Sequence, residues 1–490
     1  MSDALQSSAD ALTLNLSLVS HTNVGKTTLA RTLVRGDVGD VLDQAHVTEE
    51  SEAYTLLQTS AGERLELWDT PGFGDSARML RRLKREQSGL NWIIEQVWDR
   101  FSNRAMWCSQ QAIRNVRERA DVVLYLVNAT EDPEDAGYLD LEMEVLGWTD
   151  KPVLILLNQT GPVRPAGERE VDLRRWGEYA DRFPFVRSVL ELDAFSRSWV
   201  QEGVLFERVG EVLPPDRAQL LQRLLGEWQR RTESIFLDAM GELAAHLART
   251  ACDREALEGS GPDLLNAARR NAMKNLALRV EQSLTAAVDK MIELYGLEGD
   301  AVVEVKASID DYTLPPDEKK VWKHGIIGGV VSGALSGLGA DLVVGGLSFG
   351  GGFVAGAILG GLGAAGATRG LAIFKRGDQQ KVAAWTPEFL EGLFVDACLR
   401  YLAVAHFGRG TGPYAERREP AFWRESIETA VEAQRTGLKR VWSAASAEPG
   451  EPSRSEGELT LELGPLISAV CRLVLDSELP KETPRGSRSQ

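Results

Sequence analysis

Short apolar runs separated by amphipathic segments make up the first two hundred residues of the chain. Helical spacing lies between most of these runs, and the alternation predicts a largely parallel β-sheet covered by helices on both faces. The second and third runs are joined by Ser60-Ala61-Gly62 and predict a β-hairpin. The predicted strands are residues 12–19, 54–59, 64–69, 121–127, 152–157 and 187–192.

The pattern between and after these strands is helical. Residues 76–119 are too long for an ordinary connection, and we expect a helical insertion there. From Pro214 onward apolar residues recur at helical spacing, which predicts an all-α C-terminal domain. We expect an α/β domain over 12–205, the helical domain over 206–445, and a linker with a short helix and a disordered tail over 446–490; residues 1–11 read as a disordered tail.

A glycine-rich apolar segment at 325–368 interrupts the helical region and contains one charge, Asp341. Glycine recurs at every fourth position in each half, a pattern that lets two helices approach closely in membranes. Each half has about 20 residues, enough to span a bilayer. Basic residues on both flanks predict that the flanks lie on the cytoplasmic side. A helical hairpin that contacts the membrane is favoured, and a soluble hairpin packed inside the helical domain is the alternative.

Composition narrows the choice of partners. The net charge of −17 argues against broad nucleic-acid binding, so we expect no nucleic acid as a partner. The polar, acidic opening lacks the features of a signal peptide, and the four cysteines are widely spaced. We therefore expect a cytoplasmic protein associated with the cytoplasmic face of the inner membrane through residues 325–368.

A phosphate-binding loop is predicted between the first strand and the first helix. Gly25-Lys26-Thr27 stands directly after the strand and directly before the helix, the context that such a loop requires. Backbone N–H groups at a helix N-terminus can hold phosphate oxygens. Ser20 replaces the first glycine of the consensus, so the loop is a variant. The expected nucleotide-binding residues are Asn23, Val24, Gly25, Lys26, Thr27 and Thr28, with Lys26 on the β- and γ-phosphates and Thr27 on Mg²⁺.

A second motif follows at Asp69-Thr70-Pro71-Gly72, where a predicted strand ends. Asp69 is expected to hold Mg²⁺ through water, and the Gly72 N–H to contact the γ-phosphate. Roughly forty residues and a hairpin separate the two motifs, which is the spacing of a small GTPase domain.

With these motifs the sequence resembles the translation-factor-related GTPases, most closely the Era/TrmE-like branch, whose Asn-x-Gly-Lys loop matches residues 23–26. It also looks like a bacterial family in which such a domain precedes a helical domain of unknown function. The resemblance implies a Ras-like α/β P-loop GTPase domain, with a mostly parallel sheet, that binds GTP/GDP and Mg²⁺.

The resemblance also implies roles for single residues. Thr48 would be the switch I threonine that closes on Mg²⁺, with a plain loop threonine as the alternative. Asn23 would help to hold K⁺, with local bracing of the loop as the alternative. We therefore expect Lys26, Thr48 and Asn23 as the catalytic residues, and Thr27, Thr48 and Asp69 as the metal ligands.

Two features of the sequence bear on the rate of GTP hydrolysis. Phe73 follows Gly72, where Ras-like enzymes place a glutamine that orients water, and a phenyl ring cannot do this; we expect slow hydrolysis. A basic run begins the helical insertion. It either forms a solvated helix face or acts on a neighbouring subunit's nucleotide in a homodimer. The run consists of Arg78, Arg81, Arg82, Lys84 and Arg85.

The base-reading motif is altered. GTPases of this kind end a strand on Asn-Lys-x-Asp, and here Asn158 is followed by Gln159, Thr160 and Gly161. Loss of the carboxylate predicts weaker preference for guanine, because a charge-assisted contact is missing. We expect Asn158, Gln159 and, from a later loop, Ala194 at the base. Asp193 is the alternative source of the missing carboxylate.

Three functions follow from these patterns. The leading hypothesis is a Mg²⁺-dependent GTPase that acts as a membrane-associated switch. The alternatives are a nucleotide-binding scaffold with little turnover and a dynamin-like membrane remodeller.

Overall fold

The computed structural model describes residues 12–34, 51–74, 76–86, 104–160, 166–194, 198–257, 262–297, 302–303, 305–306, 371–376, 380–407, 421–445 and 454–477. The chain divides into two compact units, with the main boundary between Glu233 and Ser234. Each unit is described by itself below.

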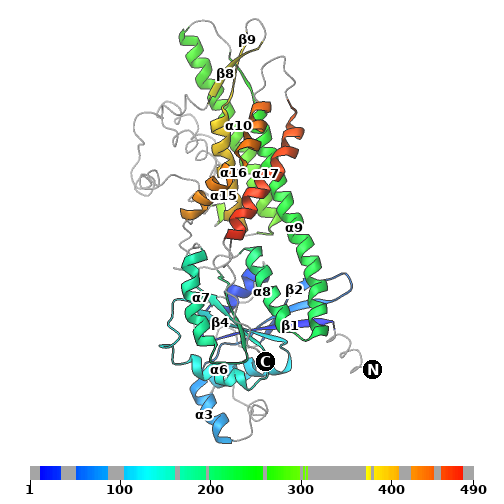
Figure 1. The fold of residues 1–490 in the computed structure, drawn as a ribbon, viewed down its shortest axis with the longest axis vertical. Helices are drawn as coiled ribbons and strands as arrows, with labels where there is room; N and C mark the ends of the chain where they lie inside the picture. The colour runs from blue at the N-terminus through cyan, green and yellow to red at the C-terminus, as the bar shows by residue number, and fades with distance from the viewer. Residues whose placement is uncertain are drawn as a thin grey trace. The chain divides into compact units, whose positions relative to one another are not determined.

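A six-stranded sheet forms the centre of the first unit (Figure 1). Its order is β2-β3-β1-β4-β5-β6, in which β2 is antiparallel to β3 and every other neighbouring pair is parallel. The predicted Ras-like α/β architecture, with its hairpin and its mostly parallel sheet, is confirmed. The strands are β1 (Thr13–Ser20), β2 (Glu52–Gln58), β3 (Arg64–Asp69), β4 (Val122–Asn128), β5 (Val153–Asn158) and β6 (Val186–Glu191).

Helices bury both faces of this sheet. Alternate residues of β4 enter different cores, because successive side chains of a strand point to opposite faces. Val123 and Tyr125 pack with α3, α5, α6 and α7, whereas Leu124 and Leu126 pack with α2, α8 and the first turns of α9. Burying each such apolar side chain stabilises the fold by about 1.5–3 kcal/mol. These helices are α2 (Lys26–Val34), α3 (Ser76–Glu86), α5 (Arg104–Glu118), α6 (Leu139–Gly147), α7 (Ala166–Ala180), α8 (Trp199–Val212) and α9 (Pro215–Cys252).

The sequence pattern placed the end of the α/β domain at residue 205, whereas the first compact unit continues to Glu233. The difference arises from the packing at the start of α9. Leu220, Leu221 and Leu224 of this helix are buried in the same core as Leu14 and Leu65 of the sheet. Arg217 adds polar contacts to the same region, donating to Asp121 and to the Thr13 carbonyl.

Long helices dominate the second unit, which confirms the predicted helical C-terminal region. Aromatic side chains join three of its segments: Phe236 of α9 and Tyr295 both meet Tyr401 of α15 edge-on, at centroid distances of 5.6 and 6.2 Å. The hydroxyl groups of Tyr295 and Tyr401 are 3.0 Å apart. Besides α9, the helices are α10 (Pro262–Leu294), α15 (Pro387–Ala405), α16 (Ala421–Ala445) and α17 (Glu456–Ser477).

A small antiparallel sheet in this unit was not predicted from the sequence. It has the order β7-β9-β8, and β8 (Leu371–Arg376) and β9 (Gln380–Trp385) form its longer pair. The third strand is β7 (Glu255–Leu257). Short strands between long helices carry too few alternating positions to be recognised against the surrounding helical pattern.

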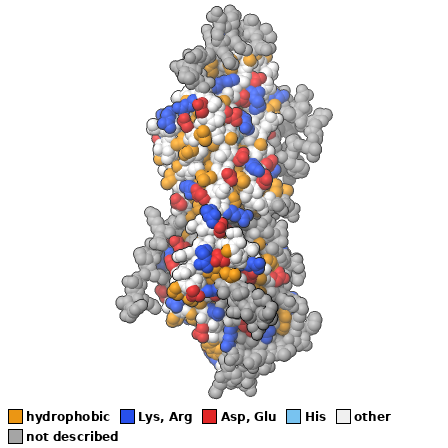
Figure 2. Space-filling view, turned by 90° about the vertical axis from the view of Figure 1, so that its right-hand side faces the viewer, with side chains coloured by type: hydrophobic (Ala, Val, Ile, Leu, Met, Phe, Trp, Pro, Cys, Tyr) orange, Lys and Arg blue, Asp and Glu red, His pale blue; other side chains and the backbone are white. Residues whose placement is uncertain are grey.

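The described helices include none that is long and apolar enough to cross a membrane. The segment 325–368, and with it the predicted glycine-rich hairpin, lies outside the described residues. On the face drawn in Figure 2, acidic and basic side chains are interspersed among the described residues.

Candidate nucleotide-binding site

Four parallel strands end at the same edge of the sheet, where α/β proteins place their ligand sites. Ser20 ends β1, Asp69 ends β3, Asn128 ends β4 and Asn158 ends β5. The register pairs Leu18 with Asp69, and Asn128 with Asn158. Residues from separate motifs are thereby brought to one edge.

The loop from Ser20 to Lys26 turns the chain from β1 into α2. Asn23 and Gly25 have positive φ angles of 65° and 93°. A side chain at residue 25 would place its Cβ 2.9 Å from Asn158 Nδ2, so glycine is required by both conformation and space. The Leu29 N–H donates to the Gly25 carbonyl at 2.9 Å and begins the helix.

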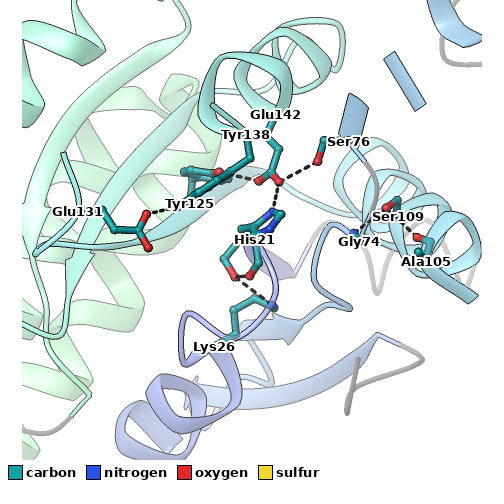
Figure 3. Close-up of polar contacts among 11 residues, drawn as sticks. His21, Lys26, Gly74, Ser76, Ala105, Ser109, Tyr125, Glu131, Tyr138 and Glu142 are labelled. Carbon is teal, nitrogen blue, oxygen red and sulfur yellow. Dashed lines mark hydrogen bonds and ion pairs between the residues drawn. The ribbon is translucent and has the colours of Figure 1, made fainter. Parts of the chain in front are cut away.

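Lys26 is buried beneath this loop, with 8% of its surface exposed. Its Nζ donates to Ser20 Oγ at 3.0 Å (Figure 3). Burial lowers the pKa of Lys26, and the nearby Asp69 and Glu142 carboxylates oppose that shift. A Cβ on Gly72 would lie 3.1 Å from Nζ, so the ammonium group sits against the Asp-Thr-Pro-Gly segment. The serine that departs from the consensus is thus a direct partner of the lysine.

Thr27 and Asp69, one from each motif, are in direct contact. Thr27 Oγ1 donates to Asp69 Oδ2 at 2.6 Å, and Asp69 is 1% exposed. Hydroxyl and carboxylate oxygens are the ligands that Mg²⁺ prefers. The donor set beside Lys26 therefore fits a magnesium ion that accompanies phosphate groups.

The side chain of Phe73, the residue after Gly72, is buried in the hydrophobic core. The Phe73 N–H donates to the Ser20 carbonyl at 3.0 Å, and its side chain, 1% exposed, belongs to the core that contains Met79. The next N–H, that of Gly74, donates to Ser109 Oγ of α5 at 3.1 Å (Figure 3). Phe73 thus anchors the segment to the core.

Asn158 joins the phosphate loop to the loop after β6. It is fully buried; its Nδ2 donates to the Val24 carbonyl at 2.8 Å, and its Oδ1 accepts the Ala194 N–H at 2.9 Å. Thr32 of α2 fastens the same loop, because its Oγ1 donates to the Ala194 carbonyl at 2.8 Å. The structure therefore brings Asn158, Val24 and Ala194 together, and Asn158 uses both ends of its amide to brace the loops.

Asp193 lies against the altered base-reading motif. Its Oδ2 accepts the Thr160 N–H at 2.7 Å and the Thr160 hydroxyl at 2.9 Å, and the residue is 3% exposed. Gln159, between Asn158 and Thr160, has a positive φ of 56°. Asp193 thus holds the turn that follows β5. Gly161 and Thr48 lie outside the described residues.

One functional candidate was missed by sequence reasoning. Glu142 of α6 is completely buried, and its carboxylate reaches His21 of the phosphate loop at 2.6 Å. A single glutamate in a helix rich in acidic residues carries no signal of this kind. The contact depends on α6 packing beside the loop, which periodicity does not reveal.

These features define a P-loop nucleotide-binding domain. A family described as "50S ribosome-binding GTPase" matches residues 15–159, so the N-terminal domain is a P-loop GTPase domain, which supports GTP binding. A second family, "Domain of unknown function (DUF3482)", matches residues 181–462. Because this match covers more than half of the chain, the protein belongs to that family.

Solved structures of GTPases are similar to the chain. Era in complex with MgGDPNP and nucleotides of 16S ribosomal RNA is 19% identical, with 41% of this chain and 57% of that chain covered and a TM-score of 0.30. Era from Aquifex aeolicus bound to GDP and AlF4⁻ is 17% identical, with 58% and 98% covered and a TM-score of 0.31. NFeoB from S. thermophilus is 16% identical, with 57% and 86% covered and a TM-score of 0.23.

The chain thus spans little more than half the length of the first of these structures. At such identities and TM-scores, these likenesses carry no argument about the fold or the chemistry of this chain. None of the curated proteins matches the chain significantly.

Proposed function

We propose that the protein binds GTP and GDP at the loop 20–27 and hydrolyses GTP slowly, as a molecular switch. The observation that carries the proposal is the meeting of Lys26, Thr27 and Asp69 at one edge of the sheet. Two motifs 42 residues apart in sequence supply a buried cation and a paired hydroxyl and carboxylate. This combination suits a nucleotide phosphate chain with its metal ion.

Each residue has a separate task in this proposal. Lys26 exchanges its contact with Ser20 for the β- and γ-phosphate oxygens. The N–H groups of residues 23–28 hold the phosphates at the start of α2. Thr27, Asp69 and Thr48 hold Mg²⁺, which supplies positive charge beside the phosphates when it is bound. Asn23 contributes either to a K⁺ site or to the shape of the loop.

The nucleotide base is read weakly in this proposal. Asn158 and Ala194 hold the loops that surround the base, and Gln159 takes the place of the lysine that covers it. The carboxylate next to these residues, that of Asp193, already accepts two hydrogen bonds from Thr160. We therefore expect GTP to be preferred over ATP by a narrow margin.

A nucleotide-binding scaffold with little turnover is the second candidate, and the burial of Phe73 favours it. The side chain after Gly72 packs in the core, so this position offers no polar group to a water molecule. Phosphate release from GTP under multiple-turnover conditions separates the candidates. Release of many equivalents per protein supports the GTPase, and tight binding without release supports the scaffold.

The sequence alone supports two further parts of the proposal, which are where the protein lies in the cell and which branch of GTPases it belongs to. The glycine pattern of 325–368 supports association with the cytoplasmic face of the inner membrane, and the loop Asn23-Val24-Gly25-Lys26 supports a place in the Era/TrmE-like branch, in a bacterium. The net charge of −17 supports the absence of a nucleic-acid partner. A homodimer completed by the basic residues of α3 remains the alternative to a solvated helix face.

Fractionation tests the membrane proposal. The full-length chain should sediment with membranes and resist carbonate extraction, and a variant lacking 325–368 should be released while it still binds nucleotide. Full-length protein recovered without detergent in the supernatant would contradict membrane association. Nucleotide-dependent tubulation of liposomes would instead support the dynamin-like alternative.

A further inference from the structure

Glu142 is a buried carboxylate at the centre of three elements (Figure 3). It lies in α6 and has no exposed surface. Its Oε1 is 2.6 Å from His21 Nδ1 and accepts the Ser76 hydroxyl at 2.8 Å, and its Oε2 accepts the Tyr125 hydroxyl at 2.6 Å. A carboxylate is costly to bury and is retained in such a place only with partners of this kind.

The two partners of Oε1 come from the two ends of the candidate site. His21 belongs to the phosphate loop, one residue after Ser20, whose hydroxyl meets Lys26. Ser76 is the first residue of α3, which follows the Asp-Thr-Pro-Gly segment. One carboxylate oxygen therefore connects the loop that faces the phosphates with the helix that follows the second motif. Tyr125, on the other oxygen, lies within the central strand β4 and connects neither.

His21 is held by contacts of both its side chain and its backbone. Its ring stacks on Tyr138, with centroids 4.2 Å apart and an angle of 22° between the planes. The backbone of His21 pairs with Phe73 in an isolated parallel bridge. On the other side, α3 packs against α6, where Lys84 donates to Glu144 at 2.9 Å. Residue 21 and Ser76 are thus joined by a short, continuous set of contacts.

We propose that Glu142 is a positioning residue that couples the phosphate loop to α3. The carboxylate makes the conformation of α3 depend on which nucleotide occupies the loop. The inference rests on the proposed function, because the nucleotide is the ligand whose presence is transmitted. By linkage, a change at Ser76 must also alter the relative affinity for nucleotides with and without a γ-phosphate.

The test deletes one hydrogen bond to the carboxylate at a time in the full-length protein. Ser76→Ala removes the connection to α3, and Ser76→Thr retains the hydroxyl. Tyr125→Phe is the matched control, because it also deletes one donor to the same carboxylate but leaves His21 and Ser76 in place. Replacing Glu142 itself would leave three partners without their acceptor and risks unfolding, so its partners are varied instead.

Hydrogen exchange of the α3 amides supplies the readout, measured with GDP and with a non-hydrolysable GTP analogue. In the unaltered protein and in Tyr125→Phe, the two nucleotides should give exchange rates that differ about fivefold or more. Ser76→Ala should lose most of this difference while it still binds both nucleotides, and Ser76→Thr should regain it. A structural role for the carboxylate predicts that Ser76→Ala and Tyr125→Phe behave alike.

Equal behaviour of those two variants would overturn the coupling, as would an unaltered protein that binds both nucleotides with the same α3 exchange. In both cases nucleotide binding itself would stand. Absence of nucleotide binding by the unaltered protein would overturn the proposed function and this inference with it.

Discussion

Lys26 Nζ donates to Ser20 Oγ at 3.0 Å, so the side chain that breaks the loop consensus is a hydrogen-bond partner of the lysine that defines it. The Ser20 hydroxyl donates in turn to the His21 carbonyl. A phosphate group that approaches Lys26 therefore meets an ammonium group that already donates to a protein hydroxyl. We therefore expect Ser20 to influence nucleotide binding through Lys26 as well as through the shape of the loop.

We expect Ser20→Gly to tighten GDP binding, because the serine hydroxyl no longer competes with phosphate oxygens for the N–H donors of Lys26. A hydrogen bond contributes about 0.5–1.5 kcal/mol net, which corresponds to roughly twofold to tenfold in the dissociation constant. Calorimetric titration with GDP and Mg²⁺ measures the effect. Ser20→Ala is the control, since it removes the hydroxyl and retains a Cβ. Weaker binding by both variants would show that the hydroxyl itself contacts the nucleotide.

Base selectivity should respond to a restored carboxylate. GTP should bind better than ATP by a narrow margin, and Gly161→Asp should widen that margin, because an acidic group can accept both guanine N–H donors. Competition of GTP and ATP against a fluorescent GDP measures the ratio for each protein. Asp193→Asn is the companion variant; it keeps an oxygen for Thr160 and alters the neighbouring charge. An unchanged ratio in Gly161→Asp would place this loop away from the base.

Asn23 supports a prediction about monovalent ions. Its positive φ of 65° places it at the bend of the loop. The resemblance to potassium-activated GTPases implies that Asn23 would help to hold K⁺. GTP turnover should then be faster in KCl than in NaCl, and Asn23→Ala should remove the difference. Equal rates of phosphate release in both salts would leave loop bracing as the role of Asn23.

The second unit should lose stability in mild acid because of His246. Burial lowers its pKa to about 3 from an ordinary value of 6.5, with Arg400 and Arg249 acting in the same direction. Its Nδ1 is 3.0 Å from Ser283 Oγ, and the ring is 1% exposed. As pH falls, the unfolded chain takes up a proton that the folded unit does not. The contribution of His246 to stability is therefore complete above about pH 6.5 and is lost between there and pH 3.

The predicted slope is about 1.4 kcal/mol per pH unit once the unfolded-state histidine is protonated. Urea unfolding at several pH values between 7 and 5 measures it, followed at the tryptophans of the second unit. His246→Gln removes the titrating group and should flatten the pH dependence, even if its stability at pH 7 is lower. A slope that is the same in both proteins would assign the acid sensitivity to other groups.

Motifs and strand patterns allowed much of the first unit to be predicted. The runs that end in Asp69 and Asn158 are strands, and the parallel order of the sheet brings their ends to the loop that contains Lys26. These predictions succeeded because local chemistry determines each motif, and the rules for parallel sheets determine where strand ends meet.

Other features depend on tertiary packing, which a linear pattern does not contain. The contact between Glu142 and His21 requires α6 to lie beside the phosphate loop, and 121 residues separate the two side chains. The start of α9 looked like part of a separate helical domain, yet Leu221 completes the core of the sheet. The strands β8 and β9 pair with each other between long helices, where six-residue runs are hard to distinguish from irregular chain.

Direct titration of the full-length protein and of Lys26→Ala with fluorescent GDP and GTP in the presence of Mg²⁺ tests the central claim. Lys26 is the buried cation of the loop, and its Nζ is the group expected to meet the β- and γ-phosphates. We predict saturable binding of both nucleotides by the unaltered protein and a loss of affinity of about a hundredfold or more in Lys26→Ala, since a charge-assisted phosphate contact is removed from a buried site. Circular dichroism should show that the variant is folded. Equal, tight binding by the folded variant would contradict the assignment of this loop as the nucleotide site.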